Sequence, residues 1–193
     1  LIKSNCNLKI FKILKDKEKN IIKNLKKIKN IDLIITTGGV SVGKKDLIRS
    51  ALIKLGFKLK FWKISLVPGK PLLFGILNNT PLFGLPGNPV SSYVCFMLFV
   101  LKSIHKMNVS EKIKAKNKKA LLIDDLYFPS DRTAYLRGKI FKKNNQDYVR
   151  VFKDQDSSLL KTLSDSNCLV RLKASAKTIK KNTMVNLIYF SNY

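Results

Sequence analysis

The sequence is poor in the residues that most often carry acid–base, nucleophilic or metal chemistry. Its 193 residues include one histidine, His105, and three cysteines, Cys6, Cys95 and Cys168. The cysteines are odd in number and lack the spacing of metal ligands, which argues against a zinc site and against a disulfide framework. We therefore expect a cytoplasmic protein whose chemistry does not depend on a histidine or cysteine nucleophile.

Acidic residues are also scarce, with 12 Asp and Glu against 38 Lys and Arg and a formal net charge of +26. Such an excess is typical of nucleic-acid-binding proteins. Only five of the basic residues are arginines, however, and arginine supplies the rigid fork that reads bases and clamps phosphates. Lysine rises together with isoleucine and asparagine along the chain, which indicates an AT-rich coding bias. We expect attraction of anionic small molecules and no nucleic-acid partner.

No long hydrophobic run or signal peptide is visible. The longest apolar stretch, "YVCFMLFVL" at 93–101, is shorter than the roughly 20 residues that a membrane-spanning helix needs. We expect a buried helix there and no membrane partner. The chain opens on Leu1 rather than methionine, from which we expect a fragment of a longer protein.

Strand-like and helix-like segments alternate over residues 1–108. We expect strands at 7–14, 32–37, 57–66, 71–77 and 81–85. Helical spacing of apolar residues predicts helices at 16–30, 47–55 and 89–104, with Gly56 as a C-cap. This order predicts a doubly wound α/β layer with a parallel sheet.

The pattern changes after residue 108. Residues 134–152 are typical of a hairpin that turns at "KNNQD" (143–147), and two further strands are expected at 167–174 and 183–190. A short helix is expected at 157–164. We therefore predict a first domain over 1–108 and a second, small all-β domain over 109–193.

A glycine turn follows the strand expected at 32–37. Gly38 and Gly39 allow positive φ and a close approach of the backbone to a ligand. The helix that follows offers unpaired N–H groups, which favour a phosphate, and the hydroxyls of Thr37 and Ser41 could add donors. Taken alone this signal is weak, since many such turns are only tight turns, and neither Walker A nor GxGxxG is matched.

A second turn of the same form lies in "GLPGNPVSS" at 84–92. Pro86 and Gly87 make a rigid turn, Pro89 suits a first helical turn, and Asn88 and Ser91 can donate to an anion. Two such turns on neighbouring strands would open onto one crevice, since ligands bind outside the carboxyl ends of parallel strands.

Charged residues accompany both turns. Lys63 lies near a strand tip and Lys70 on a Pro-Gly turn, although both could simply be solvated among the 33 lysines. Asp46 and Asp16 could hold Mg²⁺ beside a phosphate, since this ion favours carboxylate and phosphate oxygens. Their simpler roles would be a first-turn residue and an N-cap.

Three segments, "TTGGVSVGKKD", "FWKISLVPGKPLLFG" and "LFGLPGNPVSS", closely resemble the MoeA/gephyrin E-domain family of molybdopterin molybdenumtransferases. The resemblance continues in "DRTAYLRG" and "QDSSLLKTLSDSNCLVRL" and covers essentially the whole chain. It implies a three-layer MogA-like molybdopterin-binding α/β domain followed by a small β-barrel-like domain.

The resemblance also implies a function. Family members insert molybdate into adenylylated molybdopterin, with Mg²⁺-dependent release of AMP, as homodimers that work with a MogA-type partner enzyme. The implied catalytic residues are Asp16, Asp46, Lys63 and Lys70, of which the two aspartates would bind the metal. The implied substrate-binding residues are Thr37, Gly38, Gly39, Ser41, Gly43, Pro86, Gly87, Asn88, Pro89, Ser91, Arg137 and Ser157.

The chain departs from the family pattern at three places, one of which is Lys17, which follows Asp16 where a second acid is frequent. Val67 stands where some relatives have a lysine, and Asp156 and Ser158 flank Ser157 where small residues are usual. Two other functions stay open: a MogA-type molybdopterin adenylyltransferase, and a non-enzymatic basic module that binds RNA or acts as a scaffold.

Overall fold

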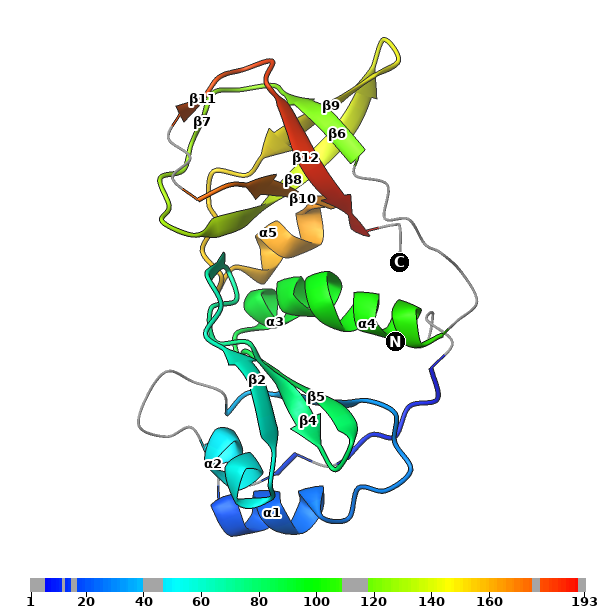
Figure 1. Cartoon of the computed structure of the whole chain (residues 1–193). Coiled ribbons are helices and arrows are strands. Elements are labelled where there is room, and N and C mark those ends of the chain that lie inside the picture. Colours follow the sequence, from blue (N-terminus) through cyan, green and yellow to red (C-terminus); the bar gives the residue numbers. More distant parts are fainter. Residues whose placement is uncertain are drawn as a thin grey trace. The chain divides into compact units, whose positions relative to one another are not determined.

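The computed structural model describes residues 6–11, 13–14, 17–39, 47–108, 118–174 and 178–190. The chain forms two compact units (Figure 1). The first, here called the α/β unit, comprises Leu1–Ile64 and Gly69–Ile104, and the second, the β unit, comprises Ser65–Pro68 and His105–Tyr193. A short strand, β3 (Leu66–Val67), therefore belongs to the β unit although it lies within the first half of the sequence.

The α/β unit is built on a four-stranded sheet with the order β1 (Ile34–Thr37), β5 (Thr80–Leu85), β4 (Leu73–Leu77), β2 (Lys58–Trp62). Only β1 and β5 are parallel, and the β5–β4 and β4–β2 pairs are antiparallel. The expected parallel sheet is thus wrong for two of three pairings. Asn78 and Asn79, with φ of 48° and 65°, join β4 to β5 in a two-residue turn that reverses the chain at once.

Two helices cover one face of this sheet. In α1 (Glu18–Leu25) and α2 (Leu47–Lys54) the buried side chains are those that the helical spacing predicts, and they join a core cluster with residues of all four strands. The Glu18 carboxylate accepts hydrogen bonds from Ser50 and Lys54, which ties α1 to α2. Gly56, with φ of 78°, ends α2 as predicted.

A long helix covers the other face, so that the predicted three-layer arrangement is confirmed (Figure 1). It consists of α3 (Pro89–Cys95), a π-helical stretch η2 (Phe96–Val100) and α4 (Leu101–Met107). Phe99 on this helix lies 6.5 Å from Phe61 of β2, ring centroid to centroid, and Phe61 lies 5.3 Å from Phe74 of β4.

The apolar stretch at 93–101 was expected to be too short to span a membrane. The helix that contains it is longer than the stretch, which corrects this expectation. The helix spans the 19 residues Pro89–Met107 and is long and apolar enough to cross a bilayer by these two criteria alone. Half of its most apolar window is buried inside the protein, as in a core helix that meets the same criteria. The finding is therefore weak evidence for a membrane span.

The strand expected at 7–14 is absent from the described residues 7–11 and 13–14. Most of its apolar side chains are exposed, with Ile10 at 87% and Ile13 at 99%, whereas Leu14 packs against the core cluster. A strand needs a partner for its backbone groups, and β1, the edge strand of the sheet, is paired with β5 alone. Apolar alternation predicted a strand here, but no pairing partner among the described residues supports one.

The β unit is a closed sheet. Strands follow the order β10 (Cys168–Leu172), β12 (Met184–Tyr189), β6 (Lys118–Leu122), β9 (Gln146–Val151), β8 (Thr133–Lys143), and β8 also pairs with β10. Strand β3 adds to β8, and β7 (Leu126–Tyr127) pairs with β11 (Thr178–Ile179). The small barrel and its β8–β9 hairpin, which turns at Asn144 and Asn145, confirm the prediction, as does the short helix α5 (Leu160–Asp165).

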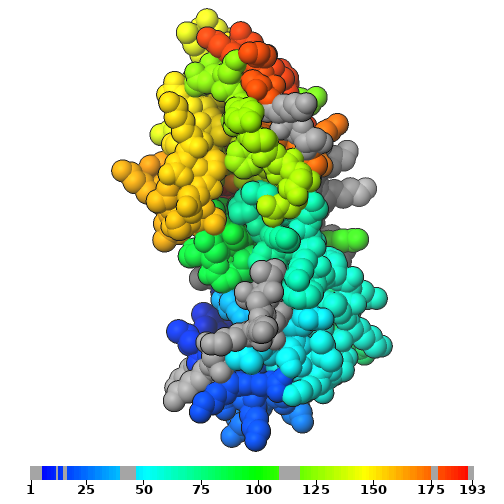
Figure 2. Space-filling view, turned by 90° about the vertical axis from the view of Figure 1, so that its left-hand side faces the viewer, coloured from blue at the N-terminus to red at the C-terminus, as the bar shows by residue number. Residues whose placement is uncertain are grey.

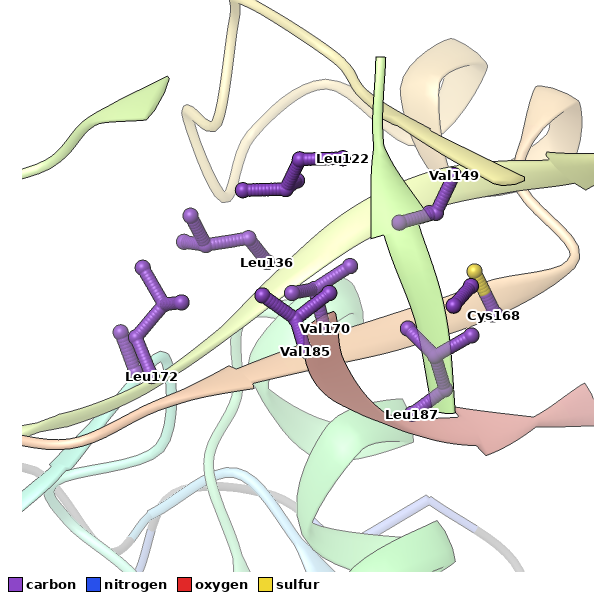
Figure 3. Close-up of a cluster of buried hydrophobic side chains, with 10 residues drawn as sticks. Leu122, Leu136, Val149, Cys168, Val170, Leu172, Val185 and Leu187 are labelled. Carbon is purple, nitrogen blue, oxygen red and sulfur yellow. The ribbon is translucent and has the colours of Figure 1, made fainter. Parts of the chain in front are cut away.

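Inward side chains fill this barrel (Figure 3). Alternate residues of each strand point to the interior, as the two-residue period of a strand requires. The buried cluster is Ala120, Leu122, Ala134, Leu136, Val149, Cys168, Val170, Leu172, Val185 and Leu187.

Candidate functional site

One edge of the α/β sheet gathers most of the predicted site residues. Because β1 and β5 are parallel, both carboxyl ends lie at this edge, together with the amino end of β4 and the carboxyl end of β2. A row of paired residues marks its last level: Thr36, Gly84, Leu73 and Trp62. The two glycine turns and Lys63 come shortly after residues of this row in the sequence, and Lys70 comes shortly before one of them.

The two glycine turns touch each other. The N–H of Gly38 donates to the carbonyl of Leu85 over 3.2 Å, and a Cβ placed on Gly87 would lie 3.4 Å from the Cα of Gly38. Gly38 and Gly39 have φ of 78° and 68°, a left-handed region that side chains avoid. The predicted adjacency of the turns is therefore confirmed, and both Gly39 and Gly87 are exposed.

The second turn leads into α3 through a capped start. Asn88 is the N-cap, and its Oδ1 accepts a hydrogen bond from the N–H of Ser91 over 3.0 Å. Pro89 is the first helical residue, as the sequence predicts. The side chain of Ser91 is buried at 7% exposure and that of Pro86 is also buried. At this turn the exposed residues are therefore Gly87 and Pro89, and the side chain of Asn88, whose oxygen caps the helix, is half-buried.

Lys63 and Lys70 are brought together by the backbone. The N–H of Ile64 donates to the carbonyl of Lys70 over 3.0 Å, and the N–H of Lys63 donates to the carbonyl of Leu72 over 3.3 Å. Both lysines are exposed. Lys63 has a φ of 62°, which is unusual for a residue with a side chain.

Trp62 supports Lys63, a role that sequence reasoning missed. The Nζ of Lys63 lies 4.1 Å from the centroid of the indole ring, and the Cζ of Arg49, from α2, lies 4.2 Å from it. Such contacts are worth about 0.5–1 kcal/mol at exposed sites. The sequence signal was the Trp-Lys pair at the end of β2, whereas Arg49 gave none. Two positive charges thus gather on one ring at this edge.

Four of the predicted residues lie outside the described residues: Asp16, Ser41, Gly43 and Asp46. Thr37, by contrast, is exposed at the carboxyl end of β1. Thr36, which was not predicted, has a buried Oγ1 without a hydrogen-bond partner among the residues that the structure describes. Within that same part of the chain, no three His, Cys, Asp or Glu side chains form a metal-binding group.

Arg137 lies in the β unit and is only 2% exposed. Its guanidinium donates to Gln155 Oε1 over 3.3 Å and to the carbonyls of Leu159 and Asp156 over 3.1 and 3.0 Å. Burial lowers the pKa of this arginine, and the nearby Asp154 and Asp156 oppose that shift. In the β unit alone, Arg137 therefore organises the segment 155–159 rather than facing solvent.

Ser157 is half-buried within the segment that Arg137 holds. Asp156, one of the departures from the family pattern, accepts a hydrogen bond from the N–H of Ser158 over 2.8 Å, and this bond is the main cause of its lowered pKa. Asp156 thus stabilises the turn that carries Ser157. Val67, another departure, packs against the barrel core.

The comparisons with known proteins agree with this architecture. Residues 1–106 match the family described as "Probable molybdopterin binding domain", and residues 119–190 match the "MoeA C-terminal region (domain IV)". The first match, which covers more than half of the chain, defines a molybdopterin-binding domain. With both matches in the family's order, the chain belongs to the MoeA/gephyrin E-domain family, as the sequence motifs predicted.

Two named relatives and one solved structure are similar to this chain. The chain is 34% identical over 163 residues to a molybdopterin molybdenumtransferase of Haemophilus influenzae, with 83% of this chain and 40% of that protein covered. It is 31% identical over 211 residues to gephyrin of Dictyostelium discoideum, with 96% and 29% covered. The crystal structure of a molybdopterin biosynthesis MoeA protein from Pyrococcus horikoshii matches with a TM-score of 0.71 at 24% identity, over 92% of this chain and 42% of that one. The chain thus spans less than half the length of these relatives.

Proposed function

We propose that this chain contributes the molybdopterin-binding and C-terminal parts of a molybdopterin molybdenumtransferase. The reaction would insert molybdate into adenylylated molybdopterin and release AMP. The observation that carries the proposal is the contact between the turns of Gly38 and Gly87 at the carboxyl ends of two parallel strands. Such an edge is where open α/β sheets bind phosphorylated ligands. The two glycines have no side chain and therefore leave the backbone at this edge accessible to a ligand.

Charge at the edge supports an anionic substrate. Lys63 and Lys70 are both exposed and lie in backbone segments that hydrogen-bond to each other, and the Trp62 ring holds the ammonium group of Lys63 near the sheet. In the proposal these two lysines bind molybdate. They also stabilise negative charge as the molybdenum is bound by the dithiolene, the pair of sulfur atoms of molybdopterin. Chemistry of this kind depends mainly on positioning and electrostatics. Asp16 and Asp46 would hold Mg²⁺, which neutralises phosphate charge when bound.

The β unit supports the transferase over a MogA-type adenylyltransferase. Its residues match the MoeA C-terminal region, a region named for the transferase family. The proposal also includes a homodimer, a MogA-type enzyme that supplies the substrate, and a cytoplasmic location. The buried thiols of Cys95 and Cys168, which form no disulfide, support a reducing compartment.

The proposal is tested by binding and turnover with matched lysine variants. Molybdopterin should change the fluorescence of Trp62, the single tryptophan, because the indole lies at the edge. Lys63→Ala and Lys70→Ala should raise the half-saturating molybdate concentration about 10- to 150-fold, since a hydrogen bond to a charged group is worth about 1.5–3 kcal/mol. Lys102→Ala, an exposed lysine of α4, is the control.

Two results would contradict the proposal. One is a Trp62 signal that does not respond to molybdopterin, and the other is an equal effect of Lys102→Ala and Lys63→Ala. Asp46→Asn distinguishes the role of Mg²⁺ from the binding of molybdopterin. This variant should abolish AMP release, while molybdopterin should still change the Trp62 fluorescence.

A further inference from the structure

An exposed row of apolar side chains crosses the outer face of the β barrel. Strand register places Phe141 of β8 opposite Tyr148 of β9, Tyr148 beside Leu121 of β6, and Leu121 opposite Met184 of β12. The four residues, here called the apolar row, therefore lie at one level on four neighbouring strands. With strands about 4.8 Å apart, the row extends for roughly 14 Å.

The row points away from the barrel core. Its neighbours along the strands, Ala120, Leu122, Val149 and Val185, belong to the buried cluster, so alternation directs the row outward. Phe141 is 41% exposed and Met184 is 48% exposed. The rings of Phe141 and Tyr148 lie nearly parallel, at 17°, with centroids 6.1 Å apart. Two aromatic rings and two aliphatic side chains thus form one open platform.

Basic side chains border the platform on both sides. Lys139 and Lys143 flank Phe141 on its strand, Arg150 follows Tyr148 and Lys119 precedes Leu121, each two residues away and so on the same face. All four are exposed. Arg150 lies 3.7 Å from Asp124, an exposed ion pair of little strength.

Within the strands themselves negative charge points away from the row, although the exposed Asp124 beyond the end of β6 pairs with Arg150 of the border. The only acid in the four strands that carry the row is Asp147, and its neighbour Tyr148 faces outward, so Asp147 points to the opposite face. Its Oδ2 accepts a hydrogen bond from the hydroxyl of Tyr189. The hairpin lies on the surface in Figure 2, in yellow.

We propose that the apolar row and its basic border bind single-stranded nucleic acid without sequence preference. Bases would stack on Phe141 and Tyr148 while phosphates meet the bordering lysines and Arg150, which is how single-stranded segments bind β-sheet platforms. The lysine-rich border suits phosphate contacts rather than base reading. An anionic membrane fits less well, because the protruding hairpin tip, Asn144 and Asn145, is polar.

This inference is independent of the proposed function and revises the expectation of no nucleic-acid partner. That expectation rested on the scarcity of arginine and on a coding bias, and no stacking pattern of aromatic residues is visible along the sequence itself. The pattern exists only across strands, where register brings residues from positions 121, 141, 148 and 184 together.

The test measures binding of fluorescein-labelled single-stranded oligouridylate of about 12 nucleotides, within the site size of one small barrel, to the full 193-residue chain. Phe141→Leu and Tyr148→Leu keep an apolar cover but remove a ring, and each should weaken binding about 5- to 150-fold, from the measured range for stacking on one ring. Tyr127→Leu, an aromatic residue of β7 at 70% exposure, is the matched control and should bind as the native chain does.

Charge is tested separately. Lys139→Gln should reduce the slope of the logarithm of the binding constant against the logarithm of the salt concentration by about one. Lys142→Gln, on the opposite face of the same strand, should leave this slope unchanged. The proposal is overturned if the native chain does not bind, if the leucine variants bind as tightly as the native chain, or if Tyr127→Leu weakens binding equally. Competition by poly-glutamate as strong as that by oligouridylate would also overturn it, in favour of an acidic protein, as would tighter binding to phosphatidylserine vesicles, in favour of a membrane.

Discussion

Gly39 is the position where the geometry of the candidate site can be tested most directly. Its φ is 68°, and a Cβ placed there would lie 2.7 Å from Cγ1 of Ile48 in the first turn of α2. Gly38, its neighbour, has a φ of 78°, but a Cβ there would meet nothing within 4 Å. Replacement by alanine should therefore have the same backbone cost at both positions, whereas a steric cost should arise only at Gly39.

The expected losses follow from these two costs. A left-handed conformation costs a residue with a side chain about 1–2 kcal/mol, so Gly38→Ala should lower the free energy of unfolding by about that amount. Gly39→Ala should add an overpacking cost of about 1–3 kcal/mol. Urea unfolding followed by Trp62 fluorescence reports the stability of the α/β unit, since no other tryptophan is present.

A double-mutant cycle with Ile48→Ala identifies the steric part. Shortening Ile48 removes the atoms that the new Cβ would meet, so Ile48→Ala should cost less in the Gly39→Ala background than in the native chain. The reasoning is refuted if Gly39→Ala and Gly38→Ala are equally destabilising, or if the cycle shows no coupling between positions 39 and 48.

Two further predictions concern the β unit. Gln155→Ala removes the acceptor for both the backbone N–H and the Nε of Arg137, and we expect a loss of about 1–3 kcal/mol in urea unfolding, because a buried donor is left without a partner; an unchanged midpoint would contradict this. The pKa of Asp125 is lowered from 3.8, first by the N–H of Lys181 and then by the side chain of Lys180. The contribution of Asp125 to the free energy of unfolding should therefore be present above pH about 4 and be lost as the pH falls below that value. Acid should then destabilise the native chain more than it destabilises Asp125→Asn. Equal acid sensitivity of the two proteins would argue against this role.

Local patterns predicted much of the fold because they depend on near neighbours in the chain. The apolar spacing of Ile21 and Leu25 gave α1, Gly56 marked the end of α2, and Asn144 with Asn145 gave the turn of the β8–β9 hairpin. The same turn signal was present and overlooked at Asn78 and Asn79, where it determines that β4 and β5 are antiparallel. The strand expected at 7–14 was wrong, since alternation alone cannot provide a pairing strand.

The sequence by itself determined the family, the helices, several of the strands and the two glycine turns, because motifs and helical or strand periods are written in consecutive residues. Only the tertiary structure decided that Gly87 lies against Gly38, that Trp62 holds Lys63, and that Arg137 is buried beneath the segment of Ser157. It also decided which side chains form the apolar row. Contacts of this kind depend on strand order and register, which arise from packing between segments far apart in the chain.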